Sequence, residues 1–79
     1  MHKTIPAEYE YQEYDVAQIK RDGKWLDFAT IRDARDARYA KQLVNGTHPE
    51  FGHGRTFFHL SAAEFRIRRR DETVFERAP

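Results

Sequence analysis

The most regular hydrophobic pattern in the chain is a pair of strand-like segments separated by a short polar turn. Residues 14–20 and 25–30 are rich in β-branched, aromatic and alternating side chains, and Asp22-Gly23 lies between them. An Asp-Gly pair between two such runs is typical of a two-residue hairpin loop, whose backbone needs positive φ angles. The sequence therefore predicts a β-hairpin that turns at residues 22 and 23.

A two-residue loop also predicts the strand register, and the register divides the side chains between two faces. In this register Lys20 is opposite Trp25, and Ala17 is opposite Phe28. The apolar face is expected to hold Ala17, Ile19, Leu26 and Phe28. The outer face is expected to hold Gln18, Lys20, Trp25 and Asp27. A slip of one residue at the turn would instead bury Trp25 in the core.

A helix is predicted after the hairpin. Residues 32–44 contain no glycine or proline, and small apolar side chains recur in them at helical spacing. Thr30, with Asp33 three residues later, resembles a capping box at the helix start, and Asn45-Gly46 is expected to end the helix. The stripe expected to pack on the sheet consists of Ala34, Ala37, Ala40, Leu43 and Val44.

A glycine-rich segment follows the predicted helix. Residues 45–56 contain three of the four glycines and are expected to form a long loop. Phe57-Phe58-His59-Leu60 is expected to anchor the far end of this loop in the core. Residues 61–64 match a capping box, and we expect one helical turn there at most.

A second alternating pattern lies near the end of the chain. Phe65 and Ile67 alternate with arginines, which predicts a half-buried strand with a basic outer face. Asp71-Glu72 either turns this strand into a short edge strand at residues 73–76 or lets it bend and continue. By the same parity Arg69 faces inward, so it is expected to lie near a rim or to pair with an acid.

These elements predict one α+β domain over residues 1–79: a small antiparallel sheet of three to four strands with one main helix packed on one face, in a ββαβ-like order. Residues 1–8 are expected to form a flexible lead. The chain has no cysteine, no signal-like apolar stretch and no run long enough to span a membrane, so the expected location is the cytoplasm.

The candidate chemical groups do not support an enzyme. His48, Glu50, His53 and His59 match no metal-binding spacing, and Ser61 lacks a nucleophile elbow. The acid pairs Asp33/Asp36 and Asp71/Glu72 are more typical of surface ion pairs, such as Arg32 with Asp36. We therefore expect no catalytic residue, no metal site and no cofactor.

Binding surfaces are better supported, although the net charge is only +1. Arg66, Arg68 and Arg70 recur at a spacing of two, so three guanidinium groups share one strand face, where they either bind an anionic partner or pair with acids on neighbouring strands. An outward Trp25 would be a typical binding anchor. The candidate partner-binding residues are Lys20, Lys24, Trp25, Arg66, Arg68 and Arg70.

The tyrosine-rich lead is an alternative surface. It is acidic, and it either engages a basic groove on a partner or forms a lead-in strand that covers a sheet edge. Its candidate residues are Tyr9, Tyr11, Glu13 and Tyr14.

The tyrosine- and glutamate-rich lead, the Asp22-Gly23-Lys24-Trp25 hairpin, the Ala/Arg/Asp helix and the closing Arg-Ile-Arg-Arg-Arg strand together resemble small phage-encoded anti-CRISPR proteins. The resemblance is one of size and layout. It implies a non-catalytic inhibitor, acting in the host bacterial cytoplasm, that binds a type I Cascade-like CRISPR effector complex and blocks its binding of target DNA. The alternative is a small nucleic-acid-binding module that uses the basic strand face. The expected state is a monomer or a weak dimer.

Overall fold

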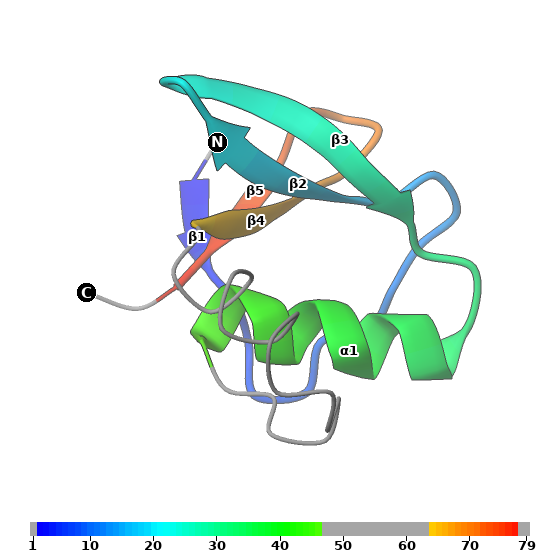
Figure 1. Ribbon diagram of the computed structural model, residues 1–79. Coiled ribbons are helices and arrows are strands. Elements are labelled where there is room, and N and C mark those ends of the chain that lie inside the picture. Colours follow the sequence, from blue (N-terminus) through cyan, green and yellow to red (C-terminus); the bar gives the residue numbers. More distant parts are fainter. Residues whose placement is uncertain (1, 47–63, 78–79) are drawn as a thin grey trace, which may run out of the picture.

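The computed structural model describes residues 2–46 and 64–77. Its elements are β1 (His2–Thr4), β2 (Val16–Arg21), β3 (Lys24–Thr30), α1 (Ala34–Asn45), β4 (Phe65–Arg68) and β5 (Val74–Glu76). The strands form one sheet in the order β1-β5-β4-β2-β3, and α1 lies on one of its faces (Figure 1). The β1–β5 pairing is parallel and the other pairings are antiparallel.

The expected α+β fold is confirmed, with five strands instead of three or four. The additional strand is β1, which lies in the segment expected to be a flexible lead. Several expectations fall outside the described residues: the loop beyond residue 46, the anchor at residues 57–60, the turn at residues 61–63, and the four residues His48, Glu50, His53 and His59.

The hairpin turn is confirmed, since Asp22 has φ 51° and Gly23 has φ 76°. The predicted register is correct from Arg21–Lys24 to Gln18–Asp27. Beyond that point the prediction is wrong, because Ala17 pairs with Ala29 and not with Phe28. A β-bulge inserts one extra residue into β3 here, which shifts all later pairs by one position.

The N-cap of helix α1 lies three residues after Thr30, the predicted cap. Asp33 is the N-cap, and its carboxylate accepts a hydrogen bond of 2.8 Å from the Asp36 backbone N–H. Thr30 ends β3 and therefore cannot cap the helix. Gly46, with φ 71°, ends the helix as predicted, and its N–H donates to the Leu43 carbonyl at 3.1 Å.

The core lies between α1 and the middle of the sheet. Helix α1 contributes Ala37, Ala40, Leu43 and Val44. The sheet and connecting segments contribute Ile5, Ala17, Ile19, Ile31, Phe65, Ile67 and Phe75. The helix packs most closely against β4. Strand β3 is two positions away from β4 in the sheet, with β2 between them.

This offset explains a second correction to the predicted faces. Leu26 and Phe28 were expected in the core, but they are 50% and 41% exposed. By register Leu26 lies on the helix side of the sheet. Phe28, the bulged residue, lies on the same side because it contacts Phe65 edge-to-face, with ring centroids 5.8 Å apart. The sequence pattern identified the face correctly, but α1 packs mainly against β4, so these two side chains stay partly exposed.

The turn between β4 and β5 involves the predicted acidic pair. Asp71 accepts a hydrogen bond of 2.9 Å from the Thr73 N–H, and Glu72 adopts φ 71°. Strand β5 forms as one of the two expected alternatives, but it is not an edge strand because β1 pairs with its outer side.

Candidate binding surface

The sheet face opposite α1, which we call the open face, carries most of the candidate residues. In the described residues no helix or strand packs against it (Figure 1). Strand alternation opposite the core residues places Gln18, Lys20, Trp25, Asp27, Arg66, Arg68 and Glu76 on this face.

A cation–π stack lies at one end of the open face. The Arg66 guanidinium carbon is 4.3 Å from the Trp25 ring centroid, and the Lys20 ammonium is 5.8 Å from it. Arg66 Nε also donates a 2.8 Å hydrogen bond to Gln18 Oε1. Burial among these side chains lowers the pKa of Arg66 from its ordinary value. Trp25 is therefore half-buried, with a cation held against its ring.

Polar contacts continue from this stack along the face. Gln18 Nε2 donates to Asp27 Oδ1 at 2.9 Å, and Arg68 lies 3.6 Å from the same Asp27 oxygen. One buried glutamine thus links an arginine of β4 to an aspartate of β3. This network orders side chains from three strands into one surface.

Further contacts between basic and acidic side chains lie at the edges of the open face. Lys20 lies 3.4 Å from the Glu64 carboxylate, and His2 lies 3.0 Å from that of Glu76. The second of the two sequence interpretations is thus realised only in part for Arg68, which pairs with an acid, but on β3, the strand beyond its neighbour β2. Because these pairs are exposed, each contributes little to stability, but together they leave a surface of mixed charge.

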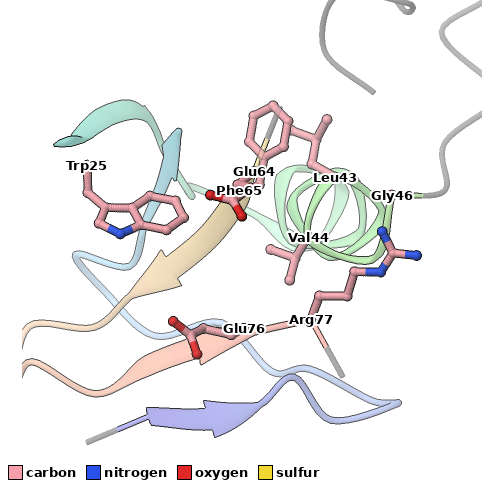
Figure 2. A pocket seen from close by; sticks show the side chains of 8 residues that line it. All are labelled: Trp25, Leu43, Val44, Gly46, Glu64, Phe65, Glu76 and Arg77. Carbon is pink, nitrogen blue, oxygen red and sulfur yellow. The ribbon is translucent and has the colours of Figure 1, made fainter. Parts of the chain in front are cut away.

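A hollow of about 340 Å³ lies beyond Trp25, between the start of β4 and the end of α1 (Figure 2). The Glu76 carboxylate points to the indole side, whereas the Arg77 guanidinium lies beside Gly46 at the helix end. The hollow is lined by Trp25, Leu43, Val44, Gly46, Glu64, Phe65, Glu76 and Arg77.

The primary candidate residues only partly come together. Lys20, Trp25, Arg66 and Arg68 share the open face, but strand alternation places Lys24 on the other face. Strand β4 ends at Arg68, so Arg70 lies in the following turn and not on the strand. There the Arg70 guanidinium stacks 5.0 Å from the Tyr14 ring centroid.

The alternative candidates in the lead are divided between core and surface. Tyr11, Glu13 and Tyr14 are exposed, whereas the Tyr9 ring packs edge-to-face on Phe75 at 5.7 Å. The Tyr9 hydroxyl donates to the carboxylate of Asp15, which has no exposed surface. Tyr9 and Asp15 thus belong to the packing of the domain and not to its surface.

Arg69 completes this buried cluster, as its inward parity predicted. Its Nε lies 3.5 Å from Asp15 Oδ2, and its guanidinium stacks 4.7 Å from the Phe75 ring centroid. Another nitrogen of the group donates to the Glu10 carbonyl at 2.6 Å. Burial, with the hydrogen bond to Asp15 as a second cause, strongly raises the pKa of Tyr9.

The Tyr14–Arg70 stack is a feature that sequence reasoning missed, whereas the predicted register had already placed Gln18 opposite Asp27. Tyr14 and Arg70 come from opposite ends of the chain, and no local pattern relates them. They meet because β2 and β4 are adjacent and both residues lie just outside the same end of the pair.

Within the described ranges, no cluster of three His, Asp or Glu side chains could hold a metal ion. The described helix is too short and too polar to cross a membrane. Comparisons with protein-family models, with curated proteins and with solved structures found no match to this chain.

Proposed function

We propose that this chain is a non-catalytic binding domain that recognises a protein partner through the open face, with Trp25 as its anchor. The observation that supports this is the half-buried indole held under Arg66 and surrounded by paired charges. Aromatic and arginine side chains are enriched at the centres of protein interfaces, and paired charges suit their rims.

The pairing of charges favours a protein partner over nucleic acid. Binding to a phosphate backbone depends on cations that are free to replace counterions. On the open face, however, Lys20 already lies beside Glu64 and Arg68 beside Asp27. The phosphates of a nucleic acid would have to compete with these carboxylates for the basic side chains. A protein partner can instead present both positive and negative groups that complement the charges on the open face.

For the identity of the partner, the resemblance to anti-CRISPR proteins leads us to propose a type I CRISPR effector complex. The proposed activity is to block target-DNA binding by that complex. The first experiment is therefore co-purification of the chain with assembled effector complexes, followed by a gel-shift of their target DNA with and without the chain. Effector complexes that neither bind the chain nor lose DNA binding would contradict this choice of partner.

The binding face is tested separately, with Trp25→Ala and Arg66→Ala. Trp25 is the only tryptophan, so its fluorescence reports directly on the open face. We expect partner binding to shift this emission and both variants to weaken binding by tenfold or more, a range typical of interface anchors. Arg38→Ala, on the exposed side of α1, is the matched loss of one arginine and should bind normally. Normal binding by Trp25→Ala would exclude the open face.

The alternative, direct nucleic-acid binding, has its own outcome. Duplex and single-stranded probes would then shift with the chain alone at low salt, and the affinity would fall as salt rises. The same affinity would fall in Arg66→Ala. We expect no such shift, and observing one would replace the protein partner by a nucleic acid.

A further inference from the structure

A second hollow, of about 480 Å³, lies at the end of the open face away from Trp25. Its lining consists of Tyr14, Val16, Thr30, Arg68 and Arg70. A neighbouring hollow shares Tyr14 and Arg70 with it, and the stack of these two side chains separates the two spaces. The other residues that line the neighbouring hollow are Gln12, Glu13 and Asp71. We call the 480 Å³ space the Tyr14 hollow.

The lining of the Tyr14 hollow contains two guanidinium groups and no carboxylate. Among the described residues, no carboxylate lies within ion-pair distance of Arg70, whose guanidinium rests on the Tyr14 ring. Arg68 reaches Asp27 with one terminal nitrogen at 3.6 Å, but its Nε is buried without a hydrogen-bond partner. Because this Nε is buried, the hollow offers a ligand the terminal N–H groups of Arg70 and Arg68, together with their positive charge.

Tyr14 and Arg70 form two walls of the Tyr14 hollow, and a buried contact between their chain neighbours holds both in place. Tyr14 immediately precedes Asp15, and Arg70 immediately follows Arg69, so the buried Asp15–Arg69 contact fixes the backbone under both walls. Tyr14 itself adopts φ 70°, a conformation uncommon for a non-glycine residue and often associated with functional sites. A pre-ordered pair of walls reduces the entropy cost of binding.

We propose that the Tyr14 hollow receives an acidic side chain, Asp or Glu, of the protein partner. Arg70 and Arg68 bind its carboxylate, and Tyr14 and Val16 contact its aliphatic part. Guanidinium groups recognise a carboxylate through paired hydrogen bonds, which gives this contact its geometry. The inference rests on the proposed function and adds the chemistry that the partner must carry.

The acids around the Tyr14 hollow favour one carboxylate over an extended polyanion. Glu13 and Asp71 line the space on the far side of the Tyr14–Arg70 stack, and Asp27 stands beside Arg68. A nucleic-acid strand crossing the hollow would bring further phosphates close to these acids. A single side chain from a folded or extended peptide avoids them.

The inference can be tested without the partner, by NMR of the arginine side-chain Nε–H groups. The folded chain is titrated with a capped glutamate-rich peptide and, separately, with the same peptide in which Gln replaces Glu. We expect saturable shifts of the Arg68 and Arg70 signals with the Glu peptide only. No shift with the Glu peptide, equal shifts with the Gln peptide, or shifts spread over all arginines would overturn the proposal.

Inorganic phosphate and a short single-stranded oligonucleotide form two further arms of the titration. If the oligonucleotide shifts the same two signals at lower concentration than the Glu peptide, the hollow belongs to a nucleic-acid site and the proposal fails. Weaker binding of the oligonucleotide than of the Glu peptide supports it. Phosphate that competes with the Glu peptide for the same two signals also supports it, because both ligands present oxyanions.

Variants then separate this inference from the proposed function. Arg70 lies in an exposed turn, so Arg70→Ala is expected to fold, and it should abolish the peptide-induced shift of Arg68 and weaken partner binding about tenfold. Arg38→Ala should leave both unchanged. A partner that still binds Arg70→Ala with full affinity would refute the role of the hollow and leave the open face intact. Peptide binding that persists in Trp25→Ala, with no partner found, would refute the proposed function and leave the hollow.

Discussion

The Arg69 guanidinium Nε lies 3.5 Å from Oδ2 of Asp15, a carboxylate that the fold removes completely from solvent. The same oxygen accepts hydrogen bonds from the Tyr9 hydroxyl and from the Gln12 N–H, the latter at 2.9 Å. The Asp15 backbone carbonyl accepts from the Ile31 N–H at 2.9 Å. One residue thus joins the lead, the end of β3 and the end of β4.

Replacing Asp15 with Asn should destabilise the domain strongly. The substitution keeps the size of the side chain but leaves the Arg69 charge buried without its partner, which typically costs about 3 kcal/mol or more. Urea unfolding followed by circular dichroism measures the change. Glu8→Gln, at an exposed position in the same lead, is the control and should change stability little. Equal stability of the two variants would mean that the Asp15–Arg69 pair does not hold the fold.

The stability of the domain should fall at high pH through Tyr9. Its pKa is raised above the ordinary value of 10.0, mainly by burial, so the folded state favours the neutral phenol. The stabilisation is fully present below pH 10 and is lost as pH rises above it, because only the unfolded chain ionises there. Urea unfolding at pH 8 and pH 11 should show a smaller decrease in Tyr9→Phe than in the parent chain. Tyr11→Phe removes an exposed hydroxyl and should follow the parent.

Leu26 and Ile19 are cross-strand neighbours on the same face, yet their truncation should have unequal effects. Ile19 is 5% exposed, and Ile19→Ala should lower the free energy of unfolding by about 2–5 kcal/mol. Leu26 is half exposed, and Leu26→Ala should cost about 1 kcal/mol or less. Similar losses in both variants would show that Leu26 is covered in solution.

The helix cap gives a smaller and more local effect. Asp33→Ala removes the acceptor for the Asp36 N–H and should cost about 1 kcal/mol, whereas Asp33→Ser should retain most of the stability. Thr30→Ala tests the cap position predicted from sequence, and it should not mimic Asp33→Ala. The three unfolding curves decide which residue caps α1.

Local chemistry made parts of this fold predictable. Asp22-Gly23 takes the positive φ angles that a two-residue hairpin loop requires, and Gly46 takes the one that ends a helix. The pairing from Arg21–Lys24 to Gln18–Asp27 followed from the loop length alone. The inward position of Arg69 followed from strand parity. Each of these depends on residues close together in the chain.

The failures have a common cause in contacts between distant segments. Because of the bulge between Ala17 and Gln18, Phe28 does not pair with Ala17 as predicted. No turn residue in the sequence indicated this bulge. Strand β1 forms because its backbone pairs with β5, about 70 residues later in the chain. The candidate site was affected in the same way. Strand β4 ends at Arg68, so Arg70 does not share a strand face with Arg66 and Arg68 as predicted.

The chain alone thus determined the hairpin turn, the helix, a strand that begins at Phe65, and an outer position for Trp25 as one of two alternatives. These depend on backbone preferences and on periods of two or 3.6 residues, which are local properties. Only the tertiary structure decided that Arg66 stacks on Trp25, that Arg70 stacks on Tyr14, and that Leu26 stays exposed. The physical reason is that strand order and helix placement depend on which distant surfaces bury one another, and that information is not contained in any one segment.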